Sequence, residues 1–232
     1  MAFLKNKVSK EELSVEKSGG GNYIGQSGVY DVVVKALVVD INDKGARTIS
    51  PFVEYNGQEQ TLYGALPLDL WDNSKVLDGA EETLAGMYII AGLDPEDIEE
   101  PIETELPIGK AGAMKDVTVL QEIEDVPMKF RIQMEYYKSS TGEIKEKAVL
   151  KDVFSTDGKS VAEILDEELE PGSRLAKLEP YLDKIKVSKD LTEEEVKAWI
   201  ANGRKSGNDS STTAAKKRPS FGSKKPKFGS KE

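Results

Sequence analysis

Alternation of apolar and polar residues marks residues 128–137, MKFRIQMEYY, as a half-buried strand. A turn follows, and the lysine-rich segment 143–154 is predicted to return beside it as a partner strand. A third strand is predicted at 28–41, GVYDVVVKALVVDI, where β-branched residues run up to the turn residues 42–45. The pattern therefore predicts a sheet built from long strands.

The dipeptide Asn56-Gly57 lies between two alternating runs and favours the left-handed backbone of a type I′ hairpin turn. A two-residue loop fixes the register. The predicted cross-strand pairs are Tyr55 with Gln58, Val53 with Gln60, Pro51 with Leu62 and Ile49 with Gly64. The opposite face of this hairpin is polar except for Phe52 and Tyr63, which we expect to lie diagonally across from each other.

Helical patterns occupy the remaining ordered segments. A short helix is predicted at 79–91, with Asp78 as its N-cap and Gly92 as its C-terminal stop. After residue 159 the period becomes helical, and two capping boxes begin at Ser160 and Thr192. Between them, residues 174–186 predict a helix interrupted at Pro180.

Seven acidic residues and three prolines crowd into LDPEDIEEPIETELPIGK, and this composition predicts a solvated loop over 92–112. Without it, the order of elements is three strands, a helix and two strands. This is the order of an OB-fold, a partly open barrel that binds oligonucleotides through its sheet face. The predicted fold class is thus mainly β with added helices, a β-barrel that is OB-fold-like, with disordered N- and C-terminal tails.

Four regions follow from these patterns. They are a flexible N-terminal arm at 1–27, an OB-fold-like domain at 28–158 with the acidic loop insertion at 92–112, a helical C-terminal extension at 159–203 and a disordered basic tail at 204–232.

Composition excludes several kinds of catalysis. The 232 residues include no histidine and no cysteine, which removes Ser-His-Asp and Cys-His chemistry and thiolate zinc sites. A metal-dependent nuclease would need carboxylates that converge from rigid elements, whereas the acidic residues at 94–105 and 166–170 are consecutive. No glycine-rich phosphate loop is present. We therefore expect no catalytic residue, no metal and no cofactor, and a protein that is not an enzyme.

Charge is divided unevenly along the chain. The formal net charge is −10, but residues 204–232 hold nine Lys or Arg against two acidic residues. The tail is thus +7 and the remainder −17, an asymmetry typical of nucleic-acid contact or of a tail that docks on its own body. The tail ends in PSFGSKKPKFGSKE, which repeats one Phe-Gly-Ser-Lys pattern. The candidate partner-binding residues are Lys216, Lys217, Arg218, Phe221, Lys224, Lys225, Lys227 and Phe228.

The polar strand faces provide a candidate nucleic-acid surface. Aromatic rings stack on unpaired bases, and lysine or arginine neutralises phosphates. The candidate stacking residues are Phe52, Tyr63 and Tyr137, and the candidate phosphate contacts are Lys35, Arg47, Lys129, Arg131, Lys145, Lys147 and Lys151. The alternative is that the rings lie under loops and the cations are merely the solvent side of a sheet.

The phrase GxYxVxVxA at 28–36, followed by ISPFVEYNGQEQTLYGALPL at 49–68 and an acidic stretch before a lysine-bearing hairpin, resembles the single-stranded DNA-binding proteins of tailed bacteriophages. The resemblance covers roughly residues 28–155. It implies an OB-fold and binding of single-stranded DNA without sequence specificity during phage DNA replication, recombination and repair. It implies that Phe52, Tyr63, Tyr137, Lys129 and Arg131 carry the binding.

The basic tail departs from this family, in which many members end in an acidic tail. The tail is expected to bind a replication protein such as a polymerase, helicase or primase, to bind DNA directly, or to dock on the acidic body. The alternative function is a phage adaptor or virion-associated protein-interaction module that acts through the basic tail.

No stretch approaches the roughly 20 apolar residues that span a bilayer, and the N-terminus MAFLKNKVSK lacks a signal-peptide pattern. We expect no membrane partner and a cytoplasmic location, which is the host-cell cytoplasm if a phage encodes the chain.

Overall fold

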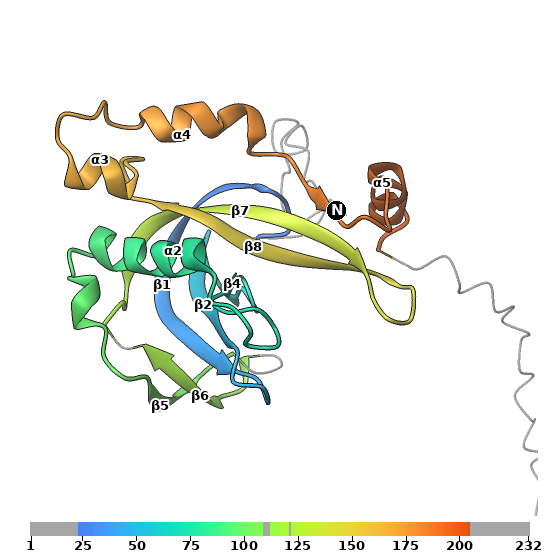
Figure 1. The fold of residues 1–232 in the computed structure, drawn as a ribbon, viewed down its shortest axis with the longest axis horizontal. Helices are drawn as coiled ribbons and strands as arrows, with labels where there is room; N and C mark the ends of the chain where they lie inside the picture. Colours follow the sequence, from blue (N-terminus) through green and yellow to red (C-terminus); the bar gives the residue numbers. More distant parts are fainter. Residues whose placement is uncertain (1–22, 109–111, 121, 205–232) are drawn as a thin grey trace, which may run out of the picture.

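The computed structural model describes residues 23–108, 112–120 and 122–204 (Figure 1). The strands are β1 (Gly28–Ile41), β2 (Arg47–Tyr55), β3 (Gln58–Thr61), β4 (Leu66–Pro67), β5 (Ile102–Leu106), β6 (Lys115–Leu120), β7 (Val126–Lys138), β8 (Ile144–Phe154) and β9 (Lys186–Val187). The helices are α2 (Asp78–Ile90), η1 (Pro95–Asp97), α3 (Val161–Leu165), α4 (Ser173–Leu178), η3 (Glu179–Tyr181) and α5 (Glu193–Ala201).

The long strand β1 is the centre of the sheet. Residues 33–41 of β1 pair antiparallel with β2, and residues 28–34 pair antiparallel with β7. The hairpins β2–β3 and β7–β8 extend the sheet on either side, and the short β9 runs parallel to β7. A third hairpin, β5–β6, joins β1 through Leu37 and Val38. The predicted long strands are thus confirmed, and β1 pairs with three strands, β2, β6 and β7, because it is long enough to do so.

The mainly β fold with added helices is confirmed, with the four strands β1–β4 before α2, one more than predicted, and the β5–β6 and β7–β8 hairpins after it (Figure 1). The prediction of a barrel is wrong, because the sheet does not close on itself. Where β8 meets the segment between β3 and β4, the amide of Leu150 donates to the carbonyl of Ala65 at 2.8 Å. The two edges are therefore linked there by a backbone hydrogen bond outside any strand ladder of the described residues.

The hairpin register is confirmed near its turn and wrong farther away. Asn56 and Gly57 have φ of 50° and 74°, and β2 pairs with β3 as the Asn-Gly turn requires. Ile49, however, pairs with Leu66 rather than with Gly64. The reason is a turn at 62–65, in which the Ala65 amide donates to the Leu62 carbonyl and Gly64 has φ of 63°.

The acidic segment 92–112 is not simply the solvated loop that its composition predicts. It contains the 3₁₀ turn η1 and the strand β5, which pairs with β6. Glu103 and Glu105 lie exposed on β5, at the end of the strand path β3-β2-β1-β6-β5. Charged side chains are common on edge strands because they oppose pairing with other chains. The acidic composition of β5 therefore made this strand look like a loop in the sequence.

Each segment predicted to be helical contains a helix, with differences at the start of one and at the end of another. Helix α2 begins at Asp78, and its N-cap is Leu77 without a side-chain hydrogen bond, so the predicted cap at Asp78 is wrong. Both capping boxes are confirmed, at Ser160 and at Thr192. The predicted helix over 174–186 is present only in its first part: α4 ends at Leu178, Pro180 lies within η3, and residues 186–187 form β9 instead. Helix α2 lies against β8, and α5 packs at the far end of the β7–β8 ribbon (Figure 1).

The core forms two clusters, one on each face of the sheet. The main cluster lies between β7–β8, β1, β2 and the helices, with Tyr88, Phe130 and Met128 fully buried. The smaller cluster packs Phe52 with Ala36, Val38 and Val119 beneath the β5–β6 hairpin. Both faces of β2 are consequently buried over residues 49–53.

The predicted N-terminal arm is partly attached to the domain. Ile24 is buried, and the Met134 amide donates to Ser27 Oγ at 2.9 Å. The prediction that residues 23–27 belong to a flexible arm is therefore wrong, since this segment adds apolar contact to the core. Expectations for residues 1–22 and 205–232, including all eight partner-binding residues of the tail, lie outside the described residues. Within the described ranges, no helix is long and apolar enough to cross a bilayer.

Candidate functional site

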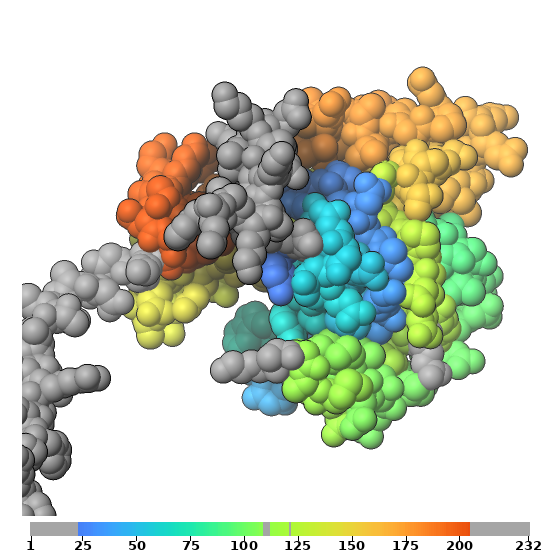
Figure 2. Space-filling model, turned by 180° about the vertical axis from the view of Figure 1, so that it is seen from behind, coloured from blue at the N-terminus to red at the C-terminus, as the bar shows by residue number. Residues whose placement is uncertain are grey.

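A groove of about 1060 Å³ opens beside the β2–β3 hairpin. Its walls are the hairpin end at 58–64, the start of β8, the segment at 23–24 and the residues that follow β5. Figure 2 shows this side of the molecule hollowed between the hairpin, in cyan, and the far end of the β7–β8 ribbon, in yellow. The groove is open along one side, as a site for an extended ligand requires.

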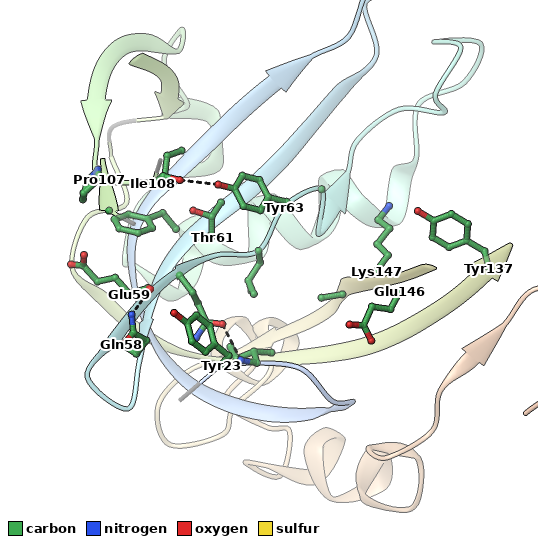
Figure 3. A pocket seen from close by; sticks show the side chains of 17 residues that line it. Tyr23, Gln58, Glu59, Thr61, Tyr63, Pro107, Ile108, Tyr137, Glu146 and Lys147 are labelled. Carbon is green, nitrogen blue, oxygen red and sulfur yellow. Dashed lines mark hydrogen bonds between the residues drawn. The ribbon is translucent and has the colours of Figure 1, made fainter. Parts of the chain in front are cut away.

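Three exposed tyrosine rings line the groove (Figure 3). The exposed fractions are 60% for Tyr23, 62% for Tyr63 and 43% for Tyr137. Tyr63 donates its hydroxyl hydrogen to the Ile108 carbonyl at 3.0 Å, and this fixes the outer end of the ring. Tyr137 points outward from β7 because its neighbour Tyr136 takes the inward position of the alternating strand. Such rings can stack on flat, unsaturated ligands.

Phe52 also lines the groove, but only 4% of it is exposed. The prediction that Phe52 is an exposed stacking ring is therefore wrong. It lies in the smaller core cluster, with Leu106 and Ile108 packed against that cluster. The cause is the β5–β6 hairpin, which covers the hairpin face that the sequence pattern left open to solvent. Phe52 forms part of the floor of the groove.

Lys147 is the candidate cation that the structure places in the groove. It belongs to β8 and is half-buried, with its Cε close to Gly64, where an added Cβ would lie 3.9 Å away. Burial lowers the pKa of the Lys147 ammonium group, since removing a charge from water favours its neutral form. No ion pair to Lys147 is formed within the described residues, so its charge remains available to a ligand.

The other six candidate cations lie outside the groove lining, and each is held by carboxylates. The pairs are Lys35 with Glu54 and Asp125, Arg47 with Asp69 and Glu81, Lys129 with Asp31, Arg131 with Asp152, Lys145 with Glu143, and Lys151 with Glu135. The Arg47 guanidinium lowers the pKa of the buried Asp69 to about 2 through a hydrogen-bonded pair. The structure therefore brings together Phe52, Tyr63, Tyr137 and Lys147. Lys145, although outside the lining, is the cross-strand neighbour of Tyr137, and the other five cations are not brought to this group.

The reasoning from sequence missed one groove residue, Tyr23, and one residue beside the groove, Arg204. Tyr23 was assigned to the arm because a glycine run precedes it, although the adjacent apolar pair Tyr23-Ile24 could have indicated packing. The Ile24 amide donates to Gln60 Oε1 at 2.9 Å and so holds this segment on the hairpin. Arg204 was assigned to the tail, yet its Nε lies 3.0 Å from Glu146 Oε1, and Glu146 lines the groove.

The groove is nearly balanced in charge. Glu59 and Glu146 line it together with Lys147, and Arg204 neutralises Glu146 from outside the lining. Among the described residues, no group of three or more carboxylates is placed to hold a metal ion. Aromatic faces and amides such as Gln58 and Gln60, rather than net charge, dominate what this surface offers.

Comparison with known proteins leaves the geometry as the basis for assigning a function. No protein-family model matches the chain, and no curated protein matches it.

Proposed function

We propose that this protein binds single-stranded DNA without sequence specificity, with unpaired bases in the groove beside the β2–β3 hairpin. The observation that carries the proposal is the set of exposed rings of Tyr23, Tyr63 and Tyr137 around one open groove. Each base has a π-face, so stacking on an aromatic ring contributes about 1–3 kcal/mol regardless of sequence. Tyrosine rings that line a groove too open to enclose a small molecule suit an extended chain of bases.

Electrostatic attraction in this proposal comes from two sources. Lys147 contributes a charge inside the groove, and residues 205–232, which follow Arg204 beside the groove, contribute +6. The ion-paired cations elsewhere leave the body acidic, which repels duplex DNA from the remaining surface. Binding should therefore depend strongly on salt through the tail and on ring identity through the groove.

The biological setting follows from the resemblance to phage single-stranded DNA-binding proteins. The protein would act in the host-cell cytoplasm during DNA replication, recombination and repair. The tail would contact a polymerase, helicase or primase.

The test is fluorescence anisotropy with a labelled oligo-dT and three proteins: wild type, the double variant Tyr63→Ala/Tyr137→Ala and the control Tyr181→Ala. Tyr181 is an exposed tyrosine outside the groove lining, with Lys184 Nζ 4.3 Å from its ring centre. We expect the double variant to lose about 2–6 kcal/mol of binding free energy, as two stacking rings would contribute. Equal affinity of all three proteins would refute the proposal.

The second candidate is an adaptor or virion-associated module that acts through the tail. It is favoured by the pairing of six of the seven candidate cations within the described residues, which leaves the groove little positive charge. A chain that ends at Arg204 separates the two functions. A DNA-binding groove retains measurable affinity for oligo-dT at low salt after this truncation, whereas an adaptor never binds the oligonucleotide.

A further inference from the structure

An apolar patch lies away from the groove, where β1 ends and the chain leaves β4. It consists of the exposed residues Ile41, Leu70, Trp71 and Val76, and the exposed fractions of Ile41 and Trp71 are 64% and 70%. Exposed apolar residues that gather in one place indicate an interaction site, whereas scattered ones do not. We call these four residues the Trp71 patch.

Hydrogen bonds hold the two loops of this patch together. Asn42 Nδ2 donates to the Trp71 carbonyl at 2.8 Å, which ties the turn after β1 to the loop after β4. Within that second loop, the Leu70 amide donates to the Lys75 carbonyl at 2.9 Å. The Trp71 patch is therefore a formed surface on which the tryptophan is displayed.

Charge around the patch is predominantly negative. Four aspartates are exposed at the end of β1, on the two loops and at the start of α2, against Lys44 and Lys75; they are Asp40, Asp43, Asp72 and Asp78. Lys44 Nζ lies 3.6 Å from the centre of the Trp71 ring, so the indole already holds a cation on its π-face. An acidic rim repels phosphates, so this surface does not suit nucleic acid. It suits a ligand that carries both aromatic rings and cations.

The chain itself contains such a ligand. PSFGSKKPKFGSKE, residues 219–232, holds Phe221 and Phe228 seven residues apart, with lysines beside each. Phe221 follows Arg204 by 17 residues, which span up to roughly 60 Å when extended. This exceeds roughly 45 Å, the diameter of a sphere with the ~17 Å radius of gyration expected for a compact chain of this length, so the length of the linker allows the repeat to reach the Trp71 patch. Tethering at this distance gives an effective concentration in the millimolar range.

We propose that the Trp71 patch is the docking site for the Phe-Gly-Ser-Lys repeat of the same chain. A phenylalanine packs on the indole and the aliphatic side chains, and lysines face Asp43 and Asp72. This docking is independent of whether the groove binds DNA, because it involves neither the groove nor its tyrosines. It neutralises part of the body charge and positions the tail away from external partners until they compete for it.

The test is quenching of Trp71 fluorescence by acrylamide, which is uncharged and so does not respond to the charge of the tail. Four proteins are compared: the full chain, a chain that ends at Arg204, Phe221→Ala/Phe228→Ala, and the matched tail control Ser223→Ala/Ser230→Ala. The contribution of Trp199, which is buried, is subtracted with the full-length variant Trp71→Phe. We expect the full chain and the serine variant to protect Trp71, and the truncated chain and the phenylalanine variant to lose that protection.

Equal quenching of Trp71 in all four proteins would overturn the proposal. Protection that disappears on dilution would overturn its intramolecular form, because it would assign the docked repeat to a second copy. Protection lost on truncation but kept in Phe221→Ala/Phe228→Ala would overturn the role of the aromatic repeat. As a check on charge complementarity, Asp43→Asn/Asp72→Asn should weaken the protection at low salt in the full chain.

Discussion

The hydroxyl of Tyr63 donates a hydrogen bond to the Ile108 carbonyl at 3.0 Å, across 45 residues of sequence. The bond joins the end of the β2–β3 hairpin to the segment that follows β5. It anchors the rim of the ring while 62% of the residue stays exposed. A ring that is oriented before a base arrives loses less conformational entropy when the base stacks on it.

The contributions of the Tyr63 ring and of its hydroxyl to binding can be measured separately. Tyr63→Ala should weaken binding of oligo-dT by about 1–3 kcal/mol, the contribution of one stacked base. Tyr63→Phe keeps the π-face and loses only the anchoring bond, so it should retain most of the affinity. Anisotropy titrations of both variants at one salt concentration test this. Equal losses for the two variants would assign the effect to the hydroxyl rather than to stacking.

Phe52 should behave as a core residue. Phe52→Ala removes a ring that packs on Ala36, Val38 and Val119, and it should lower the free energy of unfolding by about 3–5 kcal/mol. Urea denaturation followed by circular dichroism measures this loss. The exposed Tyr63→Ala serves as the control and should lower stability by only about 0.5–1.5 kcal/mol, the contribution of its one hydrogen bond. A fully stable Phe52→Ala protein would contradict the burial of the ring.

Lys147 should account for the salt dependence that arises within the groove. Each phosphate contact contributes about −0.7 to the slope of log affinity against log salt for single strands, so Lys147→Gln should make the slope shallower by that amount. Lys129→Gln is the matched control, because Lys129 is paired with Asp31 outside the groove lining. Titrations at several salt concentrations give the slopes. An unchanged slope in Lys147→Gln would exclude its contact with phosphate.

Acid should destabilise the helical extension through Glu163. This buried carboxylate accepts hydrogen bonds from the Ser160 amide at 2.8 Å, the Arg174 amide at 2.9 Å and the Ser173 hydroxyl at 2.8 Å. The bond from the Ser160 amide is the foremost cause that lowers the pKa of Glu163 from 4.5 to about 2. Because the folded pKa lies below the unfolded value, the stabilisation is fully present above pH 4.5 and is lost as the pH falls toward 2.

The variant Glu163→Gln removes the titrating group. It should lower the free energy of unfolding at neutral pH by about 1.5–3 kcal/mol, as the loss of a charge-assisted hydrogen bond does. It should also flatten the fall in stability between pH 4.5 and 2. Urea midpoints across this range measure both effects. A variant that keeps the wild-type pH profile would show that other carboxylates dominate acid unfolding.

Local rules allowed much of the sheet to be predicted from sequence. Asn56-Gly57 admits essentially one turn geometry, so the pairing of Tyr55 with Gln58 follows from the sequence. Alternation over 128–137 likewise predicted which residues of β7 face the core. These predictions succeeded because each depends on residues adjacent along one strand or across one short turn.

The errors arose where distant segments meet. Phe52 reads as solvent-facing because its neighbours on the hairpin are polar, but the β5–β6 hairpin, more than 45 residues later, covers it. The lysines and arginines were predicted to be free to contact phosphates because the sequence does not show which carboxylate will lie opposite each of them. Arg131, for example, is paired with Asp152 across the β7–β8 ladder. Tyr23 was missed because its contact with the groove depends on docking of the N-terminal segment.

The hydrogen bond between Leu150 and Ala65 has a mechanical consequence for the groove. It lies between the β8 wall, which carries Lys147, and the hairpin wall, which carries Tyr63. Ala65 and Leu150 are also buried in the main core cluster, so separating the two walls would expose apolar side chains in addition to breaking this bond. The seam therefore holds the two walls at a fixed separation, and the width of the groove is set before any ligand arrives.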